Sequence, residues 1–124
     1  MMYSIAEVAE KIDISKNTLR YYERIGLLDL IGRDSKGIRF YTDDNLDEIN
    51  KIVHLRKVGA SISEIRIFLS DEKKPTIETL QNRIQFLKHL NQKLAKEMIE
   101  INEQKDYIDK KLNQLVKTMD SPES

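Results

Sequence analysis

The stretch NTLRYYERIGLL, residues 17–28, sets the interpretation of the whole chain. Its apolar residues recur at helical spacing, so we expect a short helix that turns Leu19, Tyr22 and the small Gly26 inward. Another face of this helix presents an amide, a phenol and two guanidinium groups, from Asn17, Tyr21, Arg20 and Arg24. Such a face suits a groove lined with hydrogen-bond acceptors, and the major groove of DNA is the best candidate.

The residues before this helix predict a second helix and a brief turn. The segment SIAE, residues 4–7, is a capping box and opens a helix that runs to Ile12. Ser15 is a good N-cap for the helix that follows, and Gly26 supplies its end. Two short helices joined by about three residues form a candidate helix-turn-helix.

The segment after residue 28 predicts a hairpin, or wing. Apolar residues flank the polar turn DSKG, residues 34–37, and Gly37 suits a backbone with positive φ. A third helix is expected to start at Thr42 or Asp43 and to end at Gly59. A second capping box, SISE at residues 61–64, predicts a fourth helix.

A regular heptad pattern runs through residues 77–118 and predicts one long helix. Every d position is Leu or Ile and most a positions are apolar, which indicates a coiled coil. The chain offers no second long helix, so we expect another copy of the chain as partner. The a and d positions form an apolar stripe, the seam, which Asn91 and Lys105 interrupt at two a positions. Polar a positions fix the register of a coiled coil. The predicted dimer interface comprises Leu80, Ile84, Leu87, Asn91, Leu94, Met98, Ile101, Ile108 and Leu112.

Composition narrows the classes of function. The 124 residues carry 21 basic and 21 acidic side chains and no cysteine, so thiolate metal sites and disulfides are excluded. His54 and His89 are isolated, and no cofactor or metal is expected. No phosphate loop or nucleophile motif is present, so we predict that the chain is not an enzyme. Without a secretory signal or an apolar run long enough for a membrane span, we expect a cytoplasmic, nucleoid-associated protein.

Three motifs together resemble one protein family. Residues 19–28, LRYYERIGLL, resemble the LRYYExxGLL signature of MerR-family transcription regulators. Residues 37–41, GIRFY, resemble that family's GYRxY wing, and residues 59–65, GASISEI, resemble its GxSLxEI turn. Two departures stand out: Ile38 replaces the wing tyrosine, and Leu30-Ile31 stands where the family usually has proline.

The resemblance implies a mainly α fold. We expect a winged helix-turn-helix head with four helices and a small β-hairpin over residues 1–70, a linker over 71–76, and a coil over 77–118. Two copies would form an antiparallel coiled coil, and residues 119–124 would be a disordered tail. Such dimers bind a pseudo-palindromic promoter site beside RNA polymerase, and activating members bend and untwist the spacer, a form of indirect readout.

Individual roles follow from the helix face and the wing. The predicted DNA-binding residues are Lys16, Asn17, Thr18, Arg20, Tyr21, Arg24, Arg33, Arg39 and Tyr41. Arg24 either clamps a phosphate or pairs with Glu23 or Asp29, and Tyr41 either contacts DNA or packs under the wing. Arg56 and Lys57 either touch the DNA backbone or are plain surface charges.

Two questions stay open at this point. An architectural protein that anchors DNA and uses the coil as a spacer is the alternative to a regulator. The 124 residues hold none of the cysteines of metal-sensing members, and we expect no extra domain of the kind that drug-sensing members carry. An effector either sits between coil and head around Phe86 and Leu90, which lie off the seam, or does not exist.

Overall fold

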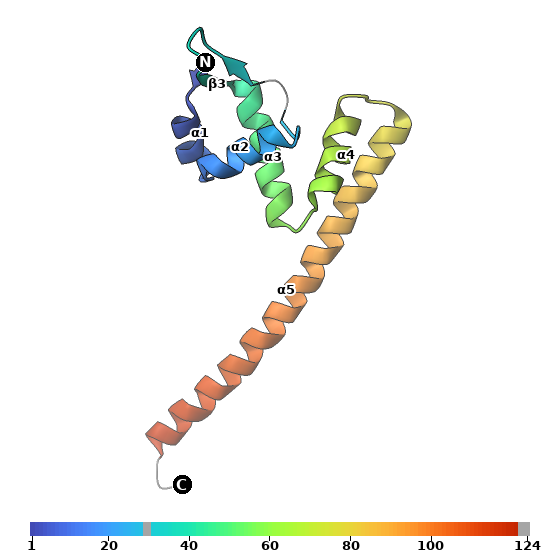
Figure 1. Cartoon of the computed structure of the whole chain (residues 1–124). Helices are drawn as coiled ribbons and strands as arrows, with labels where there is room; N and C mark the ends of the chain where they lie inside the picture. Colours follow the sequence, from blue (N-terminus) through green and yellow to red (C-terminus); the bar gives the residue numbers. More distant parts are fainter. Residues whose placement is uncertain (29–30, 122–124) are drawn as a thin grey trace. The chain divides into compact units, whose positions relative to one another are not determined.

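A computed structural model describes residues 1–28 and 31–121 of the chain. It contains two compact units: the head, Met1–Pro75, and a second unit that begins at Thr76 and is built on one long helix (Figure 1). The predicted mainly α fold with a small sheet and a long C-terminal helix is confirmed. The elements are β1 (Met2–Tyr3), α1 (Ile5–Ile12), α2 (Lys16–Arg24), β2 (Gly32–Arg33), β3 (Arg39–Thr42), α3 (Asp43–Lys57), α4 (Ile62–Glu72) and α5 (Ile77–Asp120).

Hydroxyl side chains start the helices of the head. The backbone N–H of Glu7 donates to Ser4 Oγ over 3.1 Å, and the Glu7 carboxylate accepts from the Ser4 N–H in return. Ser61 caps α4 in the same way, and Ser15 caps α2 by accepting from the Thr18 N–H, as predicted. Thr42, rather than Asp43, caps α3. These bonds satisfy N–H groups that a helix leaves unpaired in its first turn.

The sheet contains a strand that local patterns did not predict. The three strands lie in the order β1-β3-β2, and Tyr3 pairs with Tyr41 in an antiparallel ladder. Beside it, the Tyr3 hydroxyl donates to Asp43 Oδ1 over 2.8 Å. This bond, with the amino terminus 3.4 Å from Asp43 Oδ2, lowers the pKa of the Asp43 carboxyl. The amino-terminal segment is thereby tied to the start of α3.

A single apolar core holds the elements of the head together. Its buried side chains come from both helices of the helix-turn-helix, from β3, and from α3 and α4. This packing leaves the polar side of α2 outside the core. The fully buried large side chains are Val8, Leu19, Tyr41, Ile49, Ile52 and Ile65.

The boundaries around α5 differ from the predicted ones. α4 continues to Glu72, and Thr76 caps α5 through a capping box with Thr79. The predicted disordered tail began at residue 119, but α5 continues to Asp120, because no helix-breaking residue precedes Pro122. Residues 122–124 of that tail lie outside the described residues. None of the helices in residues 1–28 and 31–121 combines the length and apolar content that a bilayer crossing requires.

Candidate nucleic-acid interface

Helix α2 separates a buried face from an exposed polar face. Leu19 is fully buried and Tyr22 is 7% exposed, so both lie in the core as the helical spacing predicted. Tyr21 is 40% exposed and Arg20 is exposed. One terminal nitrogen of Arg20, Nη1, donates to Asn17 Oδ1 over 3.3 Å, which steadies the guanidinium on the helix surface. The exposed face therefore offers donors and an acceptor of the kind that read base edges.

Arg24 makes a contact that was not considered from the sequence. Its guanidinium carbon lies 5.4 Å from the centre of the Tyr21 ring, a cation–π arrangement. Glu23 forms its ion pairs with arginines of the wing. Asp29, the other partner considered for Arg24, lies outside the described residues. Arg24 and Tyr21 thus form one exposed unit at the C-terminal end of α2.

The start of α2 is set by Ser15. Its hydroxyl accepts from the Thr18 N–H over 3.0 Å and lies 2.7 Å from the Thr18 hydroxyl. Thr18 is half-buried by this contact, whereas Lys16 and Asn17 are exposed. The first turn of α2 consequently presents an ammonium and an amide to solvent.

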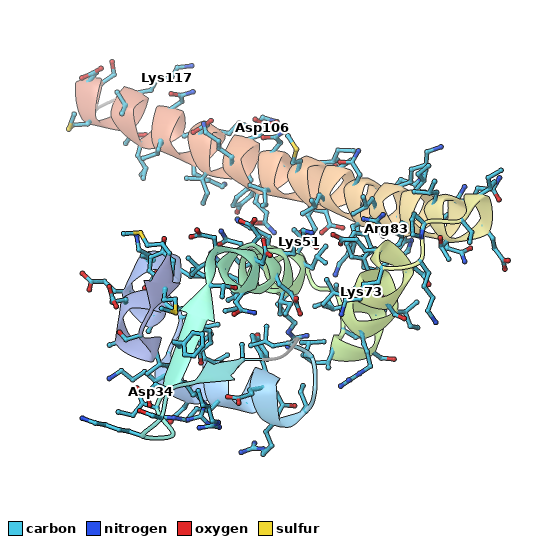
Figure 2. The ribbon with its side chains drawn as sticks, turned by 90° about the horizontal axis from the view of Figure 1, so that it is seen from above. Asp34, Lys51, Lys73, Arg83, Asp106 and Lys117 are labelled. Atoms are coloured by element: carbon cyan, nitrogen blue, oxygen red, sulfur yellow. The ribbon has the colours of Figure 1, made fainter. Side chains whose placement is uncertain are left out.

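The wing is a hairpin of β2 and β3 with an ordered turn. Asp34 Oδ1 accepts from the backbone N–H groups of Lys36, over 2.8 Å, and Ile38, over 3.0 Å. Gly37 adopts φ +77°, as predicted from the turn sequence. Asp34 is labelled in Figure 2, at the turn of the hairpin. The Asp34 side chain therefore stabilises the turn by accepting two of its backbone hydrogen bonds.

Gly32 allows an aromatic ring to lie across the hairpin. It pairs directly with Phe40 on β3, and a Cβ at Gly32 would fall 2.1 Å from Phe40 Cζ. Any larger residue at this position has to displace the ring. In the neighbouring pair of the ladder, Arg33 lies opposite Arg39.

Glu23 joins α2 to the wing. Its Oε2 lies 2.5 Å from Arg39 Nε, and its Oε1 lies 3.4 Å from a terminal nitrogen of Arg33. The other terminal nitrogen of Arg33 donates to the Gly37 carbonyl over 3.1 Å. Sequence reasoning considered Glu23 only as a partner of Arg24, because the contact with the wing joins residues ten and sixteen positions apart.

The remaining candidates divide by exposure. Tyr41 is fully buried, and burial is the main reason that its pKa is raised, with the nearby Glu23 carboxylate adding to it. This burial favours packing under the wing over a DNA contact. Arg56 is exposed and one of its terminal nitrogens donates to the Ala60 carbonyl over 2.9 Å, while Lys57 is exposed.

The predicted dimer residues lie on α5 with their apolar side chains exposed. The exposed fractions run from 44% at Leu80 to 64% at Met98, and Leu94 is half-buried. Phe86 is half-buried and Leu90 is 6% exposed, in contrast to the seam. Among the predicted interface residues, those above 40% exposure are Leu80, Ile84, Leu87, Met98, Ile101, Ile108 and Leu112.

Comparisons with known proteins agree with this arrangement. Residues 3–72 match the MerR HTH family of regulatory proteins. The HTH-type transcriptional regulator YfmP of Bacillus subtilis is 32% identical over 114 residues, which cover 87% of this chain and 79% of that protein. The uncharacterized HTH-type transcriptional regulator YyaN of the same organism is 42% identical over 71 residues, 57% of this chain but only 51% of YyaN.

The chain is similar over almost its whole length to the solved structure of HiNmlR, a MerR family regulator lacking the sensor domain, bound to promoter DNA. The TM-score is 0.86 at 30% identity, and the alignment covers 96% of this chain and 89% of HiNmlR. The similarity therefore includes both the head and the long helix.

Proposed function

Because this chain belongs to the MerR family of HTH regulatory proteins, we propose that it binds promoter DNA as a homodimer and regulates transcription from it. As a member of this family, the chain is a DNA-binding transcriptional regulator. The names of the matched relatives favour regulation over the architectural alternative. We assign no catalytic step, metal or cofactor to the chain.

The exposed face of α2 is the observation that carries the proposal. One side of α2 is buried through Leu19 and Tyr22, so the other side is held outward by the core. We propose that Arg20 contacts a base edge or a phosphate and that its neighbours line the groove. The DNA-contact set is then Lys16, Asn17, Thr18, Arg20, Tyr21 and Arg24 from α2, with Arg33 and Arg39 from the wing.

Net charge does not oppose this proposal. The chain has as many acidic as basic residues, but residues 11–39 hold seven basic and four acidic side chains. Phosphate contacts depend on the local field, which falls off over about 10 Å at 0.1 M salt. A chain of zero net charge with this local surplus of basic residues is therefore compatible with salt-dependent DNA binding.

The exposed seam of α5 supports the homodimer. Its 44 residues span about 66 Å, and a helix that shows an apolar stripe to water over such a length needs a partner. Asn91 and Lys105 would set the register of two copies. Lys105 lies 2.9 Å from Asp109 one helical turn away, which holds its ammonium on the helix surface.

We extend the proposal to the promoter. Two heads joined by one coiled coil would bind two half-sites on the same face of the duplex. Bending or untwisting the spacer between them costs about 1–6 kcal/mol, which the contacts of both heads have to offset. RNA polymerase is the partner that would read the altered spacer.

The test is binding followed by transcription. The full chain is used to select duplexes from a random pool, and the selected duplex is placed between the two polymerase elements of a test promoter. We expect run-off transcription to change when the chain is added. Binding that leaves transcription unchanged at saturation would favour an architectural role instead.

A further inference from the structure

Two like charges face each other across the wing. Arg33 and Arg39 are directly opposite in the β2–β3 ladder. Like charges in such positions destabilise a strand pair unless a counter-charge lies between them. Glu23, which is 22% exposed and belongs to α2, supplies that counter-charge to both guanidinium groups.

Arg33 and Arg39 contact Glu23 through different guanidinium nitrogens. Arg33 has both terminal nitrogens engaged, one with Glu23 and one with the Gly37 carbonyl. Arg39 meets Glu23 through Nε, and its terminal nitrogens have no hydrogen-bond partner among the described residues. Arg39 is also less exposed than Arg33, 27% against 47% for the side chains, so its guanidinium is held more firmly.

We infer that Glu23 is a positioning residue for DNA binding, which orients the terminal fork of Arg39 toward a DNA phosphate while Arg33 braces the turn of the wing. This inference rests on the proposed function. A planar fork with two adjacent donors matches two phosphate oxygens, a geometry that a lysine does not reproduce. Fixing Nε beforehand removes rotamer freedom that the side chain otherwise loses on binding.

The charge balance of the cluster fits this role. One carboxylate between two guanidinium groups leaves one net positive charge beside α2. Glu23 therefore repels phosphate less than an isolated carboxylate would, and it links the wing to the helix that we propose enters the groove. A phosphate contact from Arg39 would fix the register of α2 on the duplex.

A pair of conservative substitutions separates the two arginines. Arg39→Lys keeps the charge but loses both Nε and the fork, so affinity of the full chain for the selected duplex should fall about tenfold. Arg33→Lys is the comparison variant: Arg33 belongs to the proposed contact set, but both of its terminal nitrogens are already engaged within the chain, so we expect a clearly smaller loss of affinity together with a lower melting temperature. Equal affinity losses for the two variants, or wild-type affinity for Arg39→Lys, would overturn the inference.

Glu23→Gln tests the positioning itself. Because a phosphate contact carries no base sequence, affinity should fall severalfold for the selected duplex and also for a shuffled duplex of the same length, although a negative charge is removed. A rise for both duplexes would mean that Glu23 merely masks the arginines. Wild-type affinity for both duplexes with a lower melting temperature would mean that Glu23 only stabilises the fold. Either result contradicts positioning.

A readout without DNA completes the test. The Nε–H proton of Arg39 should be protected from exchange in NMR spectra of the free wild-type chain and should lose this protection in Glu23→Gln. Exchange at the same rate in both proteins contradicts the contact. Failure of the wild-type chain to bind any duplex would instead overturn the proposed function, which is a separate result.

Discussion

The head buries many of its large apolar side chains, whereas α5 exposes most of its own. All six of the largest fully buried side chains lie in the head, and the one buried residue of α5 in the described part of the chain is Leu90. The exposed large apolar residues are concentrated on α5, where side chains project around the helix (Figure 2). The head buries the side chains of its core within one chain, whereas α5 leaves an apolar stripe exposed, as we expect of a surface that a second helix covers.

This difference assigns a role to each exposed surface. On the head, the exposed side of α2 and the wing carries polar and basic side chains, as expected for a surface that meets phosphates and base edges. On α5, what remains outside is a heptad seam, as expected for a surface that meets another helix. A change in the head should therefore alter DNA binding or local stability, and a change in the seam should alter assembly.

The largest effect is expected from a charge in the seam. Leu94→Asp would place an unpaired carboxylate in each copy of the dimer interface, which costs about 3–5 kcal/mol when buried. The dimer should dissociate, and DNA affinity should fall by about 10²–10⁴ because the second head is no longer tethered. Sedimentation equilibrium of the full chain measures the mass directly.

The control for this substitution lies two residues away. Gln92→Asp adds the same charge at an exposed position off the seam and should leave the mass at that of a dimer. A Leu94→Asp variant that sediments like wild type would contradict the assignment of the seam as the dimer interface.

A smaller effect is expected on the face of α2. Arg20→Ala should reduce affinity for the selected duplex by about 1–3 kcal/mol per head and leave the dimer intact. Gel-shift titration at fixed salt gives the affinity. Lys96→Ala removes one positive charge from an exposed position of α5 and serves as control. If the two variants bind equally well, Arg20 does not face the DNA.

A third substitution acts on the packing of the wing. Gly32→Ala should destabilise the head by about 1–3 kcal/mol, because the new Cβ collides with the Phe40 ring. Urea unfolding measures this loss, and Phe40→Leu in the same chain should recover part of it. Gly37→Ala meets no atom within 4 Å but keeps φ +77°, so it should cost about 1 kcal/mol through backbone strain alone. Equal stability of wild type and Gly32→Ala would refute the contact.

The smallest effect concerns acid stability of the head. The Tyr3 hydroxyl and the amino terminus lower the pKa of Asp43 in the folded chain, so the ionised carboxyl stabilises the fold above its unfolded pKa of about 3.9. This stabilisation is lost as pH falls through the folded value. Asp43→Asn should therefore be less stable than wild type near neutral pH, and the difference should vanish in acid. A pH-independent difference in urea unfolding would exclude this linkage.

Local signals predicted much of the head. Hydroxyl caps at Ser4, Ser15 and Ser61 and glycines at residues 26 and 37 act within a few residues, so the sequence pattern shows them directly. The pairing of β1 with β3 joins segments about forty residues apart through a two-residue strand. No periodicity can develop over two residues, so this strand leaves no local signal.

The site was predicted in outline, and its internal contacts were not. The exposure of Arg20 and the burial of Leu19 follow from helical spacing. The bridge from Glu23 to Arg39 depends on how the wing folds back beside α2, which is a tertiary contact. The burial of Tyr41 likewise depends on β3 becoming the central strand, once β1 pairs along its other edge.

The central claim is a homodimer in which a coiled coil of two α5 helices carries two DNA-binding heads. Hydroxyl-radical footprinting of the full chain on the selected duplex is its most direct test. We predict two protected half-sites related by a twofold axis, with centres a whole number of helical turns apart on one face of the duplex. A single protected segment without a symmetry mate, or protection that does not depend on sequence, would contradict the account.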